Sequence, residues 1–122
     1  MDISKQVGID VQRALDEDVG PGDLTAALVP ATARAIATIL CRESAVICGR
    51  PWVDEVLRRV APTAQVRWLV DEGQRCEPGQ TVVQIEGWAR ELLTAERCCL
   101  NFLQTLSAVA TKTARYVAAV AG

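Results

Sequence analysis

Histidine is absent from the 122-residue sequence, and Lys5 and Lys112 are its only lysines. Without histidine, neither a histidine general base nor a Ser-His-Asp triad can be assembled from this chain. The sequence also contains neither a GxxxxGK[ST] nor a GxGxxG phosphate-binding motif. The residues present therefore predict no catalytic site within this chain.

Strong charge of either sign and long apolar runs are also missing. The formal net charge is −2, and the 13 basic residues are scattered among 15 acidic ones without a basic block. This distribution argues against nucleic-acid binding. No apolar run reaches the roughly eighteen residues of a membrane span, and the N-terminal MDISKQVGID lacks an apolar signal core. We therefore expect a cytoplasmic protein with no membrane partner.

The five cysteines show no CxxC spacing. With histidine absent, this pattern predicts no metal site. In a cytoplasmic protein the cysteines are expected to be thiols. The adjacent Cys98 and Cys99 would point about 100° apart on a helix, which favours small buried side chains at a packed seam over a redox pair. Aromatic residues make up only 4% of the chain, so the core should be aliphatic.

A long amphipathic helix is predicted over 89–121, and the rest of the chain is organised around it. Apolar or small residues recur there at spacings of three and four. At about 1.5 Å per residue the helix would run to roughly 50 Å, whereas a compact chain of this size is only about 35 Å across. Either the helix breaks near Ser107, or part of it packs on something that this chain lacks.

The N-terminal segment predicts a second amphipathic helix over 2–16. We expect it to end before Gly20-Pro21-Gly22, because proline disfavours helical geometry in the residue before it. The following loop would carry an acidic cluster at 16–18, interpreted as solvated carboxylates rather than a metal site. Asp23 and Thr25 are typical of turn chemistry in that loop.

The middle of the chain alternates short strands with one helix. Strands are predicted over 33–41 and 45–48, forming a hairpin around the charged turn 42–44. A helix beginning at Pro51 follows, and then come a strand over 66–70, a turn region over 71–80 and a strand over 81–86. This order predicts one α+β domain over 1–122, with helices against one face of an antiparallel sheet.

Arg97 is the candidate binding residue. It lies within the small and apolar run ERCCLNFLQ, where a guanidinium is costly unless acceptors meet it. Two interpretations stay open. Arg97 forms a surface ion pair, either with Glu96 or Glu91 or with an acidic partner on the N-terminal side, or it binds the carboxylate of a ligand.

Three motifs carry a family resemblance. EDVGPGDLT, CRESAVICGRPW and ERCCLNFLQTLS occur in this order. In these motifs, and over essentially all 122 residues, the chain resembles the N-terminal part of quinolinate phosphoribosyltransferase, the carboxylating nicotinate-nucleotide pyrophosphorylase of NAD biosynthesis. One departure is Ala108, where the family usually has glycine, a change that could tighten a close helix approach.

The resemblance implies a hammerhead-like N-terminal domain, with the C-terminal α/β barrel of the family absent from these residues. Family members convert quinolinate and phosphoribosyl pyrophosphate, with Mg²⁺ held by the barrel, to nicotinate mononucleotide, CO₂ and pyrophosphate. They form homodimers in which the N-terminal domain of one subunit covers the barrel of the other. Arg97 would then bind a quinolinate carboxylate in the partner subunit's site. The chain alone is expected to be inactive.

Three alternatives remain. The turn EGQRCEPGQ resembles those of biotinyl or lipoyl carriers, but no lysine lies between Lys5 and Lys112 to accept the cofactor. A non-catalytic dimerisation or docking domain is compatible with the same elements. A molybdenum-transport-associated paralogue shares the general layout, although ERCCLNFLQ and EDVGPGDLT favour the quinolinate enzyme.

Overall fold

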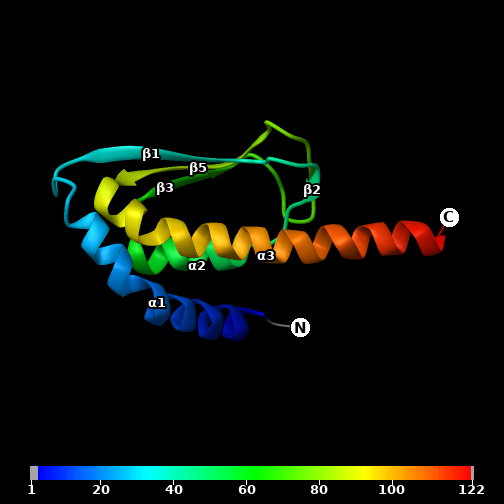
Figure 1. Cartoon of the computed structure of the whole chain (residues 1–122), viewed down its shortest axis with the longest axis horizontal. Coiled ribbons are helices and arrows are strands. Elements are labelled where there is room, and N and C mark those ends of the chain that lie inside the picture. Colours follow the sequence, from blue (N-terminus) through cyan, green and yellow to red (C-terminus); the bar gives the residue numbers. More distant parts are fainter. Residues whose placement is uncertain (1–2, 122) are drawn as a thin grey trace.

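A three-stranded antiparallel sheet is covered on one face by helices α2 and α3, and α1 lies against these two helices (Figure 1). The computed structural model describes residues 3–121, and of residues 18–26 it describes the backbone alone. The elements are α1 (Ser4–Ala26), β1 (Arg34–Leu40), β2 (Ala45–Val46), α2 (Arg50–Val60), β3 (Gln65–Trp68), β4 (Arg75–Cys76), β5 (Thr81–Trp88) and α3 (Ala89–Ala121). The predicted α+β class, with helices on one face and a long final helix, is confirmed. These residues form no barrel.

The sheet has the order β1-β5-β3, so the predicted hairpin between 33–41 and 45–48 is wrong. β1 instead pairs with β5, with Ala37 opposite Ile85, and the two-residue β2 pairs with β4. The eight-residue β5 offers β1 a longer ladder than β2 could. Its inward residues Val83 and Ile85 also bury apolar surface under the helices. Non-local pairing therefore outweighs the local turn.

Helix α1 runs through Gly20-Pro21-Gly22 to Ala26, so the loop predicted after residue 16 is also wrong. Part of the steric clash imposed by a proline involves the Cβ of the preceding residue, and Gly20 has no Cβ. This makes the helical conformation less costly there than the sequence pattern suggested. The side chains of Asp23 and Thr25, predicted to form a turn, lie outside the described residues, and so does that of Asp18.

The core is aliphatic, as the composition predicts, and it also includes four of the five cysteines. Cys98 and Cys99 are each 1% exposed, which confirms them as buried side chains at the helix seam. Val53 and Val56 of α2 and Val83 of β5 are completely buried in this core. The helix α1 adds Val7 and Val11 to this cluster.

Helix α3 continues through Ser107, so the first of the two alternatives for its length, a break near Ser107, is wrong. The Ser107 hydroxyl accepts a hydrogen bond from the Cys48 N–H at 2.9 Å and donates to the Cys48 carbonyl at 3.1 Å. One turn later, the Thr111 hydroxyl accepts from the Val46 N–H at 2.9 Å and donates to the Ser107 carbonyl at 2.6 Å. The hydroxyls of α3 thus bind the backbone of β2 at Val46 and of the residue Cys48 after it, which attaches this part of α3 to the segment 46–48.

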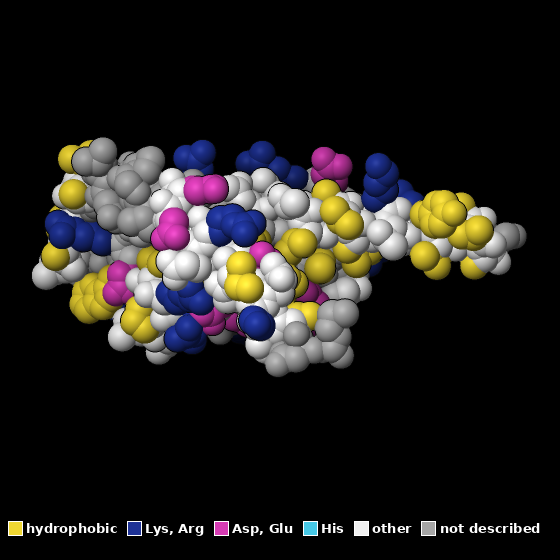
Figure 2. Space-filling view, turned by 90° about the horizontal axis from the view of Figure 1, so that it is seen from below, with side chains coloured by type: hydrophobic (Ala, Val, Ile, Leu, Met, Phe, Trp, Pro, Cys, Tyr) yellow, Lys and Arg dark blue, Asp and Glu magenta, His cyan; other side chains and the backbone are white. Residues whose placement is uncertain are grey.

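Beyond Thr111, α3 projects past the sheet and the other helices (Figure 1). Apolar side chains gather on this projecting end (Figure 2). Tyr116 is 72% exposed and Val120 is 69% exposed, and Val109 and Val117 are also exposed. Contiguous exposed apolar surface of this kind is typical of a site covered by another protein surface.

The start of α2 is capped by the carboxylate of Glu72. Gly49 has a φ of 125° and provides no side-chain cap for α2. Glu72 accepts hydrogen bonds from the Gly49 N–H at 3.0 and 3.1 Å and from the Arg50 N–H at 3.2 Å. A carboxylate at this position satisfies free helix N–H groups and interacts favourably with the helix dipole.

We expect Glu72→Ala to lower the free energy of unfolding by about 1 to 2 kcal/mol, because it leaves the N–H groups of Gly49 and Arg50 without their acceptor. Urea unfolding measures the change. The matched control is Asp71→Ala, which removes the same charge from the neighbouring exposed residue. Equal losses in the two variants would show that the cap contributes nothing.

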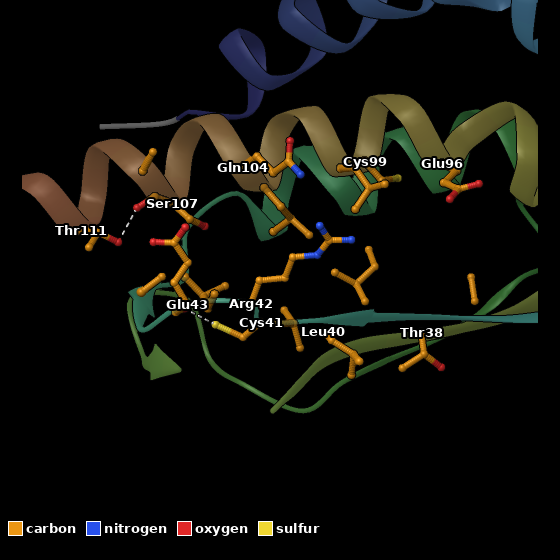
Figure 3. A pocket seen from close by; sticks show the side chains of 18 of the residues that line it. Thr38, Leu40, Cys41, Arg42, Glu43, Glu96, Cys99, Gln104, Ser107 and Thr111 are labelled. Atoms are coloured by element: carbon orange, nitrogen blue, oxygen red, sulfur yellow. Dashed lines mark hydrogen bonds between the residues drawn. The ribbon is translucent and has the colours of Figure 1, made fainter. Parts of the chain in front are cut away.

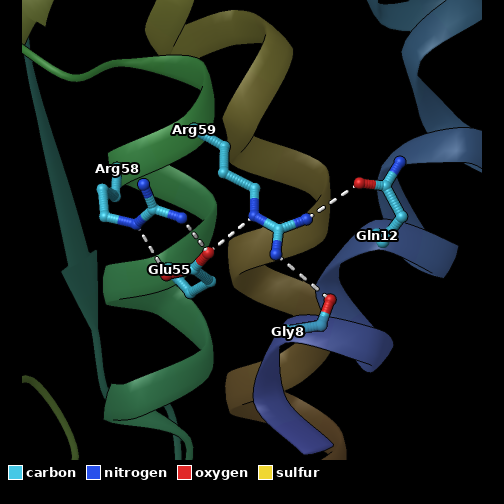
Figure 4. A network of polar contacts seen from close by, with 5 residues as sticks. All are labelled: Gly8, Gln12, Glu55, Arg58 and Arg59. Carbon is cyan, nitrogen blue, oxygen red and sulfur yellow. Dashed lines mark hydrogen bonds and ion pairs between the residues drawn. The ribbon is translucent and has the colours of Figure 1, made fainter. Parts of the chain in front are cut away.

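A polar network joins α2 to α1 (Figure 4). Glu55 accepts hydrogen bonds from Arg58 Nε at 2.8 Å and from Arg59 Nε at 2.6 Å. Arg59 also donates to the Gln12 side chain at 3.0 Å and to the Gly8 carbonyl at 3.3 Å. The hydrogen bond from Arg58, followed by that from Arg59, lowers the pKa of Glu55 to about 2.

This lowered pKa predicts a pH-dependent stability difference between the wild type and Glu55→Gln. Since the folded pKa lies below the unfolded value of about 4.3, the contribution of Glu55 is present above that value and is lost as the pH falls toward about 2. At pH 7 we expect the variant to be less stable by roughly 1 kcal/mol or less, because Arg58 is largely exposed. Urea unfolding at neutral and strongly acidic pH measures the difference, and one that stays constant would contradict this assignment.

Candidate functional site

The structure places Arg97 on the exposed side of α3, in a firmly held part of the helix. The residues that follow it, Cys98 and Cys99, are almost completely buried, and so is Ala95. A helix fixed in this way presents the Arg97 guanidinium from a rigid backbone. The side chain can therefore reach outward to a carboxylate without a backbone rearrangement.

The two carboxylates considered as ion-pair partners of Arg97 differ in environment. Glu96 is exposed, whereas Glu91 is half-buried. The Oε2 atom of Glu91 is buried without a hydrogen-bond partner in the described part of the chain. Neither observation decides between the ion-pair and the ligand-binding interpretation, so the role of Arg97 remains a prediction.

An open groove runs between β1 and α3, with a volume of about 1040 Å³ (Figure 3). We call it the β1–α3 groove. Its floor is apolar and includes Ile39, Leu92 and Leu103. β1 is an edge strand of the sheet, so this side of the two-layer sandwich has no further strand to cover it. Sequence reasoning missed the groove, because it arises from two elements that are distant in the chain.

Charged side chains line the groove from both layers. Arg42, from the loop after β1, extends into the groove toward α3 (Figure 3). Lys112 and Arg115 line it from α3, while Glu43 and Glu96 supply the opposite charge. Arg97 does not line the groove, although its helix neighbours do. The amphipathic pattern of α3 was the only sequence signal for Glu96, Lys112 and Arg115, and no signal marked Arg42 or Glu43 as groove residues.

Cys48 and Cys99 are poor nucleophiles in this environment. Burial, with smaller contributions from Cys98 and from the Asp54 and Glu96 carboxylates, raises the pKa of Cys99 to about 12. Burial and then Glu72 raise the pKa of Cys48. Both groups remain protonated near neutral pH, which argues against a thiolate nucleophile at these two positions.

No metal centre can be built from the residues described. Among them, no group of three or more His, Cys, Asp or Glu side chains is placed to hold a metal ion. The family resemblance places Mg²⁺ in the barrel domain, which these residues do not include, so the role of that ion stays a prediction. Within the same residues, no helix is both long and apolar enough to cross a bilayer.

The fold and the groove define a two-layer α+β domain, open on one side and ending in a projecting helix. Residues 23–107 match the family described as quinolinate phosphoribosyl transferase, N-terminal domain. The chain belongs to this family.

Individual relatives agree with this assignment. The chain is 34% identical over 105 residues to the chloroplastic nicotinate-nucleotide pyrophosphorylase [carboxylating] of Oryza sativa subsp. japonica, covering 84% of this chain and 28% of the rice protein. The crystal structure of NadC from Streptococcus pyogenes superposes with a TM-score of 0.89 at 30% identity, covering all of this chain and 44% of that one. Nicotinate-nucleotide pyrophosphorylase from Ehrlichia chaffeensis gives a TM-score of 0.87 at 31% identity, covering 94% of this chain and 42% of that one.

The chain thus spans roughly a third of the length of the curated relatives that it matches, 28% of the rice protein and 38% of a relative from Synechocystis. The family assignment made from the motifs is confirmed for the N-terminal domain. The activity, substrates and assembly of the longer proteins are treated below as a proposal.

Proposed function

We propose that this chain, as a single domain over 1–122, caps the substrate site and supports dimerisation of a quinolinate phosphoribosyltransferase. In that enzyme Arg97 binds a carboxylate of quinolinate in the site of the partner subunit. The observation that carries the proposal is the exposed position of Arg97 on a helix whose neighbouring residues Cys98 and Cys99 are buried. Quinolinate is a dianion, and a guanidinium fork binds a carboxylate through two parallel hydrogen bonds.

Phosphoribosyl pyrophosphate, Mg²⁺ and the reacting atoms belong, in this proposal, to the barrel domain of the longer enzyme. This chain has no histidine, and its described residues offer no metal cluster. Its own contribution is to orient quinolinate and to exclude water from the site. The chain alone is then inactive. A location in the cytoplasm belongs to the same proposal.

Dimerisation is supported by the exposed apolar end of α3. Tyr116, Val117 and Val120 are all more than half exposed. Burying them against a second protein surface would remove apolar area from water, which is the main favourable term in protein association. The same surface favours the second candidate function, a docking domain with no ligand contact of its own.

A mixing assay distinguishes these two functions. A full-length relative whose arginine equivalent to Arg97 is changed to alanine is mixed with this chain, and the formation of nicotinate mononucleotide is followed. We expect the wild-type chain to restore activity and the Arg97→Ala chain to restore at least about a hundredfold less, since a charged hydrogen-bonded contact would be lost.

The matched control is Arg67→Ala, which removes an exposed arginine from β3, away from the groove and from the end of α3. This variant should restore activity like the wild-type chain. Co-assembly is checked by size-exclusion chromatography. If both variants restore activity equally, or if the co-assembled wild-type chain restores none, the docking function stands and the role of Arg97 is wrong.

A further inference from the structure

Two of the five cysteines meet at one end of the β1–α3 groove. Cys41 directly follows β1, and Cys76 lies in β4. The Cys41 N–H donates to the Gln80 carbonyl at 2.9 Å, and the Gly79 N–H donates to the Cys41 carbonyl at 2.8 Å. A turn closed by a hydrogen bond from the Gln80 N–H to the Glu77 carbonyl leads back to Cys76. The backbone therefore holds Cys76 beside Cys41.

The two thiols lie near one another and differ in access. Cys76 is completely buried, and after burial the nearby Cys41 thiol is the next cause of its raised pKa. Cys41 is 7% exposed and lines the groove (Figure 3). Its sulfur donates to the Glu43 carbonyl at 2.7 Å. A small reagent in the groove thus reaches Cys41 first, and Cys76 lies behind it.

We propose that Cys41 and Cys76 form a disulfide site that is closed by exchange with a low-molecular-weight disulfide such as oxidised glutathione. The Cys41 thiolate attacks one sulfur of the reagent, and the reagent leaves one thiolate and a mixed disulfide on Cys41. The Cys76 thiolate then attacks the Cys41 sulfur and displaces the second reagent thiolate. The two protein thiols lose two hydrogens in total, and one oxidised reagent becomes two thiols.

The other three cysteines lack this arrangement. Cys98 and Cys99 are adjacent on α3 and point in different directions from the helix axis. Burial, followed by the nearby Glu72 carboxylate, raises the pKa of Cys48 and disfavours its thiolate. Burial also raises the pKa of Cys76, and the neighbouring Cys41 adds to that shift, so exchange should be slow and should speed up with rising pH.

The bond would change how firmly the groove rim is held. Arg42 and Glu43 follow Cys41 directly, and both line the groove. The small sheet that supports them, β2 with β4, contains only two residues in each strand. Isolated two-stranded sheets of this kind are marginally stable. A covalent link from Cys41 to β4 would therefore order the rim, independently of any role of Arg97.

Peptide mapping tests the site directly. The folded chain is incubated with oxidised glutathione at mildly alkaline pH, blocked with a thiol alkylator and digested with trypsin. Cleavage separates the relevant cysteines, because Cys41 falls in residues 35–42, Cys48 in 43–58, Cys76 in 76–90 and the Cys98-Cys99 pair in 98–112. The linked pair of peptides 35–42 and 76–90 is expected to exceed every other linked pair by roughly tenfold, because the fold sets the effective concentration of the two thiols.

The same reaction in urea provides the contrast. In the unfolded chain the shorter loop favours the Cys41–Cys48 pair over Cys41–Cys76. Cys48→Ser should keep the native link in the folded chain, and Cys76→Ser should leave only mixed disulfide on Cys41. The proposal is overturned if the folded chain gives the pairing pattern seen in urea, forms only mixed disulfides, or does not react.

Discussion

Gly49→Ala is expected to lower the free energy of unfolding by about 3 kcal/mol. Gly49 has a φ of 125°, a conformation that side chains with a Cβ rarely adopt. A Cβ built at this position would lie 3.3 Å from the Phe102 carbonyl oxygen and 3.4 Å from the Leu106 side chain. Backbone strain and a close contact with α3 therefore act together. Relieving the contact would move the start of α2 away from α3.

Gly73→Ala is the matched control for this variant. Gly73 also has a positive φ, 82°, but nothing lies within 4 Å of a Cβ at that position. Gly73→Ala should lower the free energy of unfolding by only about 1 kcal/mol, which is the penalty for a left-handed residue with a Cβ. Chemical unfolding of both variants measures the difference. The close approach of Gly49 to α3 is contradicted if the two substitutions cost the same.

The double variant Ser107→Ala, Thr111→Val is expected to lower the free energy of unfolding by about 3 to 5 kcal/mol. The two hydroxyls accept hydrogen bonds from the N–H groups of Cys48 and Val46, and both hydroxyl residues are 8% exposed. Removing the acceptors leaves the N–H groups of Val46 in β2 and of Cys48, two residues after β2, without partners. An unsatisfied buried donor costs about 1 to 3 kcal/mol, and the loss of a further hydrogen bond to the Cys48 carbonyl adds to this.

Thr113→Val tests the specificity of this effect, because Thr113 is an exposed threonine on the same helix. It should change stability by less than about 0.5 kcal/mol. Hydrogen exchange of the Val46 and Cys48 amides provides a second measurement, and both should lose protection in the double variant alone. Unchanged protection there would mean that water or another group replaces the hydroxyls.

Local patterns predicted the helices best. The bounds of α3 follow from periodicity sustained over 33 residues without glycine or proline inside them. The sequence also identified Cys98 and Cys99 as buried side chains, since small residues fit a helix seam. By contrast, the hairpin expected between β1 and β2 was wrong, because strand pairing depends on a partner more than forty residues away. The residues 42–44 favour a turn, and nothing in them indicates that β1 pairs with β5.

Part of the candidate site could likewise be predicted from the sequence, and part could not. Arg97 stands out within a single helix, so its residue type and neighbours could indicate an anion contact. The β1–α3 groove could not be predicted, because Arg42 and Lys112 come together only when the sheet lies over α3. The expected break at Ser107 failed for a related reason. In an isolated helix a serine weakens the structure, whereas here its hydroxyl is hydrogen-bonded to the backbone N–H and carbonyl of Cys48.

The hydrogen bonds of Ser107 and Thr111 attach α3 near one end of the sheet, and the part of the helix beyond Thr111 can tilt about this attachment point. Ten residues of continuous helix extend beyond Thr111, an arm of about 15 Å. A tilt of about 10° at this attachment point would displace the C-terminal end of α3 by about 3 Å, since an unbroken helix moves as a rigid rod. Small changes in the position of β2 relative to α3 therefore produce larger displacements at Tyr116 and Val120, whose apolar side chains are exposed.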